Sequence, residues 1–127
     1  MRRLFPLLAA MAVLACGAAV SGTYHLVSVN GMELPANDPL FPTYTVTSGS
    51  LTLASDSTFT LTITSHEADG DPETENESGT FTLDESNVIH FTPGPESDDM
   101  TRTEGMWDGD QITVKVLDDD ITLVFRR

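Results

Sequence analysis

Apolar and threonine side chains alternate along several stretches of this 127-residue chain. In the clearest stretch, Phe59, Leu61 and Ile63 alternate with four threonines. A period of two places successive side chains on opposite faces of a strand, so each such stretch predicts a strand with one apolar face. We find no sustained helical spacing of apolar residues after residue 22, and the pattern therefore predicts an all-β fold.

Turn-forming sequences separate these stretches and set their number. Asn30-Gly31 and Asp108-Gly109 are typical of tight β-hairpins, and residues 55–57 and 118–120 are rich in turn formers. We expect eight strands, near residues 22–29, 49–54, 58–65, 78–83, 87–92, 101–107, 110–117 and 120–126. Short connections make an antiparallel meander, and closing it into an eight-stranded up-and-down barrel removes the exposed edges.

Three stretches lack the alternation and are expected to be loops. Residues 34–47 contain three prolines, while residues 66–77 and 93–99 combine proline with acidic residues. We interpret the acidic stretch 66–77 as a solvated loop. Asp69 and Asp71 within it could offer oxygen atoms to calcium, but they lack the spacing of an EF-hand loop, so calcium binding there stays an open alternative.

The first residues have the parts of an export signal. Positive charge at Arg2 and Arg3 precedes an apolar segment at residues 4–14, which is shorter than the roughly 20 residues that span a bilayer. Val13 to Cys16 resembles a lipobox, the sequence at which bacterial lipoproteins are cleaved and lipidated. We therefore expect a signal peptide at residues 1–15, a tether at residues 16–21 lipidated on Cys16, and one domain at residues 22–127.

The expected export and the net charge limit the classes of partner that we expect. A lipid on Cys16 implies anchoring to a membrane of the bacterial cell envelope, which in a Gram-negative cell would be the periplasmic face of the outer membrane. An ordinary secretory signal, with a secreted or periplasmic product, is the alternative. The formal net charge of −14 argues against binding nucleic acid. Because Cys16 is the only cysteine, no disulfide within the chain can form.

The expected domain resembles the lipocalin-like domains of small bacterial lipoproteins, which are calycin-type barrels. The opening sequence from Gly22 to Gly31 has the glycine and the aromatic residue of that family's first strand. Later strands of the family resemble residues 49–53, 79–83 and 123–127. The resemblance implies that Tyr24 replaces the family's usual tryptophan and packs against Arg127, or else Arg126, to close one end of the barrel.

No motif in the sequence predicts catalysis or a cofactor. No nucleophile is set beside a base in a recognisable motif, and glycine-rich phosphate loops are absent. His25, His66 and His90 have no spacing that demands a metal site. We therefore expect neither an enzyme nor a bound metal or other cofactor.

Two functions of different classes fit these observations. The first is a carrier or sensor of a small apolar ligand at the barrel mouth, framed by loop 34–47, with contacts from Met32, Leu40, Phe41 and Tyr44. The second is a protein-interaction or structural module of the envelope, in which a filled barrel binds another exported protein. Both are compatible with eight strands, because such a barrel either fills with side chains or admits one small ligand.

The lipobox-like ending predicts that Cys16→Ser releases the protein from the membrane. When the full chain is expressed in a bacterial host, the wild type should sediment with membranes and the variant should remain in the soluble fraction. Immunoblots of the two fractions measure the difference, and equal partitioning of both proteins would contradict lipidation at Cys16.

Overall fold

The computed structural model describes residues 19–94, 103–116 and 120–127, and its regular elements there are all strands. In chain order they are β1 (Gly22–Val29), β2 (Met32–Glu33), β3 (Ala36–Asn37), β4 (Tyr44–Leu53), β5 (Thr58–Glu67), β6 (Glu73–Leu83), β7 (Val88–Pro93), β8 (Thr103–Asp108), β9 (Gln111–Val116) and β10 (Ile121–Arg126). β2 and β3 have two residues each and lie within the connection from β1 to β4. Eight longer strands therefore build the fold.

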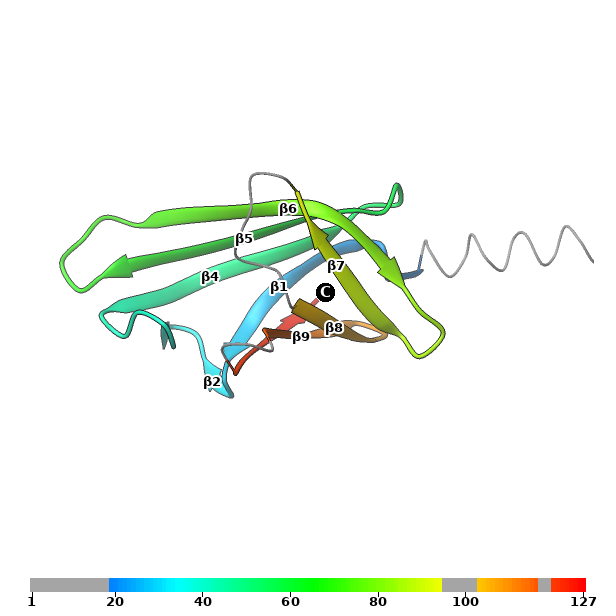
Figure 1. Cartoon of the computed structure of the whole chain (residues 1–127). Coiled ribbons are helices and arrows are strands. Elements are labelled where there is room, and N and C mark those ends of the chain that lie inside the picture. Colours follow the sequence, from blue (N-terminus) through cyan, green and yellow to red (C-terminus); the bar gives the residue numbers. More distant parts are fainter. Residues whose placement is uncertain (1–18, 95–102, 117–119) are drawn as a thin grey trace, which may run out of the picture.

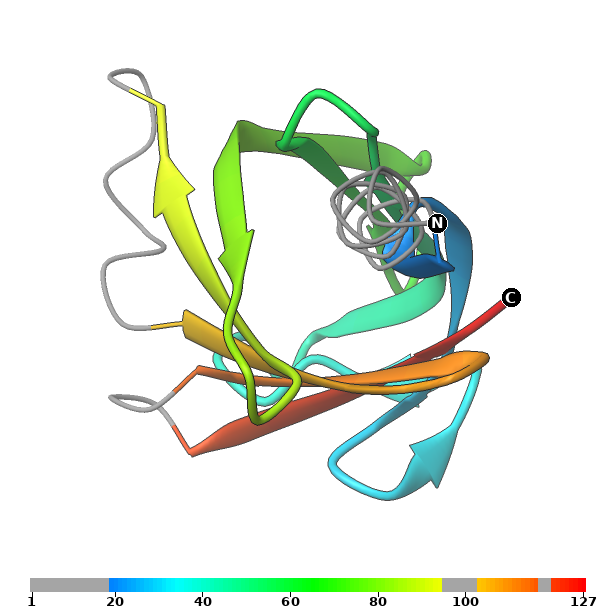
Figure 2. The same cartoon turned by 90° about the vertical axis from the view of Figure 1, so that its right-hand side faces the viewer.

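These eight strands form a closed antiparallel barrel, in which the strands surround a common interior (Figure 1, Figure 2). From β4 to β10 each strand pairs with the next one in the sequence. β1 closes the ring because it pairs with β10 on one side and with β4 on the other. The topology confirms the eight-stranded up-and-down barrel that the alternation predicted.

The barrel has a filled end, which we call the closed end, where β1 begins and β10 ends. Its side chains come from the inner faces of almost every strand and are 0–1% exposed: Tyr24, Leu53, Phe59, Ile89, Ile112 and Phe125. The rings of Phe59 and Phe91 meet edge-to-face, with centroids 5.0 Å apart. Close packing of aromatic and aliphatic side chains leaves this half of the interior solid.

Three strands are longer than the sequence predicted and extend the opposite end, which we call the open end. β4, β5 and β6 have 10, 10 and 11 residues, and they project beyond the rest of the barrel (Figure 1). The predicted loop 34–47 was therefore too long, because its last residues belong to β4 and β3 lies within it.

The prediction of a solvated loop at residues 66–77 was wrong. This stretch contains the end of β5, a turn at residues 68–72 and the beginning of β6. Polar side chains pair across the two strands on the outer face, where Thr62 donates to Asn76 (2.9 Å) and the hydroxyls of Thr64 and Thr74 are 3.0 Å apart. Backbone pairing does not require apolar side chains, which is why a search for apolar alternation missed it. Of the other predicted loop, 93–99, Pro93 ends β7, and residues 95–99 lie outside the described residues.

The residue types at the hairpin between β1 and β2 explain its turn. Asn30 and Gly31 both have positive φ, +49° and +81°, which a two-residue hairpin of this hand requires and which these two residues adopt readily. The Asn30 side chain also accepts a hydrogen bond from the backbone nitrogen of Thr122, at 2.7 Å. The turn is thereby fastened to β10. Within the described ranges, no helix is long and apolar enough to cross a membrane.

We expect Gly79→Ala to destabilise the barrel. Gly79 lies on the inner face of β6, and a Cβ atom there would meet the backbone oxygen of Thr92 and come within 2.9 Å of the Phe59 ring. Neither the paired backbone nor the packed ring can move freely, so the free energy of unfolding should fall by about 1–3 kcal/mol. Urea denaturation followed by circular dichroism measures this change.

Gly70→Ala is the matched control for that substitution. Gly70 lies in the turn between β5 and β6, where the nearest atom to an added Cβ is 3.4 Å away. We expect its free energy of unfolding to stay within about 0.5 kcal/mol of the wild type. Equal stabilities of the two variants would show that the close approach at Gly79 does not constrain the barrel.

Candidate functional site

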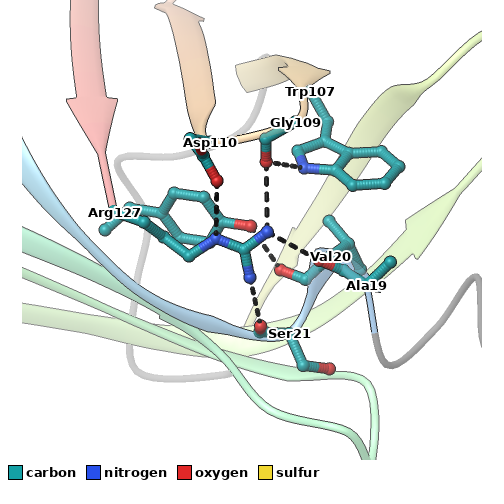
Figure 3. Close-up of polar contacts among 8 residues, drawn as sticks. Ala19, Val20, Ser21, Trp107, Gly109, Asp110 and Arg127 are labelled. Carbon is teal, nitrogen blue, oxygen red and sulfur yellow. Dashed lines mark hydrogen bonds and ion pairs between the residues drawn. The ribbon is translucent and has the colours of Figure 1, made fainter.

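Arg127 seals the closed end of the barrel (Figure 3). Its guanidinium carbon lies 5.0 Å from the centroid of the Tyr24 ring, a cation–π distance. The same group donates hydrogen bonds to the backbone oxygens of Ser21 (3.0 Å), Ala19 (2.9 Å) and Gly109 (3.2 Å). One side chain thus joins the segment before β1 to the turn between β8 and β9.

Tyr24 is the buried centre of this arrangement. Its hydroxyl donates to the backbone oxygen of Val20 at 2.7 Å, and the residue is 0% exposed. Burial raises the pKa of the Tyr24 hydroxyl, and the nearby charge of Arg127 opposes that shift. The contact that the sequence predicted between Tyr24 and a C-terminal arginine is formed by Arg127. Arg126 donates instead to the side chain of Gln111 at 3.0 Å.

The loop before β4 presents two apolar side chains to solvent at the open end. A carboxylate oxygen of Asp38 accepts hydrogen bonds from the backbone nitrogens of Leu40 (2.9 Å) and Phe41 (3.3 Å). The backbone nitrogen of Tyr44 donates to the oxygen of Phe41 at 2.8 Å, and their rings meet edge-on with centroids 6.3 Å apart. Leu40 and Phe41 are 52% and 62% exposed. Local hydrogen bonds therefore hold these side chains outward.

Three of the four predicted ligand contacts, Leu40, Phe41 and Tyr44, consequently lie together. The fourth, Met32, lies on β2 opposite Val29 and is 48% exposed. β1 and β2 meet at the open end, so all four residues lie at the same end of the barrel. This arrangement does not test the prediction that these four residues contact a ligand.

The inner face of the barrel changes from apolar to acidic toward the open end. Along β5, Phe59 is buried, Leu61 and Ile63 are half-buried, and Glu67 is exposed. Their partners on β6, in the order Phe59, Leu61, Ile63, are Gly79, Glu77 and Glu75, and Glu73 pairs with Ser65. Directly opposed residues of antiparallel strands share a face, so these glutamates follow the core residues along the same inner surface.

Tyr44 joins the acidic part of this surface. It pairs with Glu67 across β4 and β5. The Glu67 carboxylate, and then the negative charges of Glu73 and Glu75, raise the pKa of the Tyr44 hydroxyl. We use the name projecting face for the inner-side residues of the long strands at the open end: Tyr44, Val46, Ile63, Glu67, Glu73 and Glu75.

Sequence reasoning missed the carboxylates of the projecting face. The pattern that could have revealed them is the spacing of two residues from Glu73 through Glu75 and Glu77, which continues through Gly79 to Phe81. That spacing is typical of a strand whose inner positions are acidic at one end and apolar at the other. A search restricted to apolar residues recognised only the apolar half of this strand.

The structure keeps the three histidines apart in separate local settings. His90 is 3.0 Å from a carboxylate oxygen of Asp84, His66 contacts the backbone oxygen of Glu67 at 2.7 Å, and His25 is exposed on β1. The hydrogen bond from His90 and those from the turn backbone lower the pKa of Asp84. Among the described residues, no group of three His, Cys, Asp or Glu side chains is placed to hold a metal ion.

A pocket of about 350 Å³ lies outside the barrel rather than at either end. It is lined by Val88, Glu104, Gly105, Met106, Thr113 and Lys115, from β7, β8 and β9. Glu104 and Met106 alternate with the buried residues of β8, so they belong to its outer face. The pocket is therefore separate from the predicted ligand contacts.

Comparison with known proteins adds no further assignment, because no family model, curated protein or solved structure matches this chain.

The contacts of Arg127 predict that Arg127→Met destabilises the barrel. The substitution keeps an unbranched apolar side chain but removes every hydrogen bond to the segment before β1. We expect the free energy of unfolding to fall by about 1.5–3 kcal/mol, the range for hydrogen bonds made by a charged group. Arg126→Met removes the same charge from an exposed position and should cost less than about 0.5 kcal/mol. Urea denaturation of both variants tests the difference, and similar losses would contradict a sealing role for Arg127.

Proposed function

We propose that this chain is a membrane-tethered, lipocalin-like binding protein of the bacterial envelope, which holds a small apolar ligand at its open end. Four large hydrophobic side chains are exposed among the described residues, and three of them lie in the connection from β1 to β4: Met32, Leu40 and Phe41. This grouping is the observation that carries the proposal. Exposed apolar residues gathered in one place are typical of binding surfaces.

The distribution of buried side chains supports the open end as the site. Tyr24, Phe59 and Phe125 fill the closed end and leave it without space for a ligand. Leu61 and Ile63, farther along the inner face, remain half-buried. An apolar ligand that covered Leu61, Ile63 and the ring of Phe41 would remove apolar surface from water, which is the main source of affinity for such ligands.

The tether would present this open end away from the membrane. Arg127 holds Ala19 and Ser21 against the closed end. If Cys16 carries the lipid, the chain from Cys16 to Ala19 reaches at most about 11 Å. The closed end would then lie next to the membrane surface, and the open end would face the compartment from which a ligand arrives.

Binding of an uncharged apolar dye tests the proposal. Nile red should give a saturable increase in fluorescence with the wild-type protein. Phe41→Ser should weaken its affinity about five-fold, because it removes an apolar side chain worth about 1 kcal/mol of contact. Met106→Ser is the matched control, since Met106 is similarly exposed (49%) but lies on the outer face of β8. Its affinity should equal that of the wild type.

Two outcomes would count against a ligand at this site. Absence of saturable binding would favour the alternative, a protein-interaction module whose exposed Leu40 and Phe41 dock to another exported protein. Equal loss of affinity in both variants would place the dye elsewhere. Trp107 is not used as the reporter, because its indole nitrogen donates to Gly109 at the closed end, far along the barrel from the proposed site.

A further inference from the structure

We infer that the open end selects cationic amphiphiles: the carboxylates of the projecting face would hold a protonated amine, and the apolar tail would run along Ile63 and Leu61. This inference rests on the proposed function, because it names the ligand class of the same site. It starts from an apolar inner wall that no other element of the described residues covers fully. The acidic residues bear on the ligand class because they lie on the same inner face as the apolar residues.

The register of β5 and β6 places carboxylates of one strand beside apolar side chains of the other along the inner wall. Glu75 lies directly opposite Ile63, Glu77 lies opposite Leu61, and Phe59, four residues deeper than Ile63 along β5, closes the interior. At about 3.3 Å per residue, the levels of Ile63 and Phe59 are about 13 Å apart. A ligand would therefore meet carboxylates on the β6 side, the apolar side chains of β5 beside them, and an apolar floor at Phe59.

No basic side chain in the described ranges forms an ion pair with Glu67, Glu73 or Glu75. Lys115 is exposed on β9 opposite Glu104, and Arg127 is engaged at the closed end. Glu67 first, and then Glu73 and Glu75, raise the pKa of the nearby Tyr44 hydroxyl, as negative charges around it would. A potential that disfavours a phenolate favours a cation at the same place.

The aromatic residues beside these carboxylates add a second reason for a cation. Tyr44 pairs with Glu67 across β4 and β5, and the Phe41 ring meets the Tyr44 ring at an interplanar angle of 69°. Ammonium groups are attracted to the faces of aromatic rings, and carboxylate headgroups are not. The same site would therefore repel a fatty acid, although the tail of a fatty acid suits the apolar wall equally well.

Three ligands with one tail and different headgroups test the inference. Octylamine, octanol and octanoate are titrated into the purified protein by isothermal calorimetry at pH 7 and low salt. Octylamine should bind at least about ten-fold more tightly than octanoate, with octanol between them, since the Coulomb term changes sign with the headgroup. Added salt should reduce this preference through screening.

Paired substitutions locate the preference. Glu73→Gln with Glu75→Gln should weaken octylamine about five-fold or more and leave octanol unchanged, because only the charged headgroup meets these side chains. Glu85→Gln with Glu104→Gln removes the same charge from the closed-end turn and the outer face, and should leave both affinities unchanged. Thermal unfolding of each variant verifies that the fold is retained.

The outcomes separate this inference from the proposed function. Equal affinities for the three ligands would overturn the inference while an apolar site remained. Tighter binding of octanoate would overturn it as well. Binding of none of the three, together with no Nile red binding, would overturn the proposed function itself. An equal effect of the two paired substitutions would assign the preference to net charge and would also overturn the inference.

Discussion

Closure of the barrel depends on β1, which divides its hydrogen bonds between two neighbours. Gly22 to His25 pair with β4, and His25 to Val29 pair with β10. The register shift between Leu26 and Ser28 falls where β1 leaves one neighbour and continues along the other, and such irregularities bend and twist a strand. Because the ring closes through this strand, the barrel proper exposes no complete edge to which another chain could add. Arg127 then fastens the segment before β1, so the strand that closes the barrel is also held at its entry.

The unequal lengths of the strands give the molecule two different ends. At the closed end almost every barrel strand contributes a buried side chain to the core around Tyr24, Phe59 and Phe125. At the open end β4, β5 and β6 continue beyond the part of β4 that pairs with β1. On β4, Val46 stays buried beside Ala36 of β3, whereas on β5 the inner side chains of Leu61 and Ile63 are half-buried. The exposed Leu40 and Phe41 stand at this open end because Asp38 fixes their loop.

The sequence predicted the class, the number of barrel strands and the closed end, but it predicted the open end poorly. Alternation of Phe59, Leu61 and Ile63 was sufficient for β5, because burial on one face imposes a period of two. The contact of Tyr24 with Arg127 was predicted from a family resemblance and from the alternation along the last strand, which places Arg127 on the inner side. Glu73 and Glu75 were assigned to a loop because their inner positions face water rather than a core. The hydrogen bonds of Asp38 to Leu40 and Phe41 are local. Their effect on how Leu40 and Phe41 are placed depends on where β4 begins, and composition does not indicate that boundary.

Glu73 and Glu75 also constrain how far the barrel can be filled. Both occupy inner positions of β6, and an ionised carboxylate moved into an apolar interior without a partner costs several kcal/mol. In the described ranges neither forms an ion pair with a basic side chain, so side chains cannot close over this end without that cost. Toward the open end, Val29 and Val46 are buried while Leu61 and Ile63 of β5 remain half-buried. Under the proposed function, an occupant that brings a positive charge to these carboxylates and an apolar group to Ile63 would offset part of that cost. The acidic stretch that was predicted to be a loop thus limits how far apolar side chains can cover the inner face of β6.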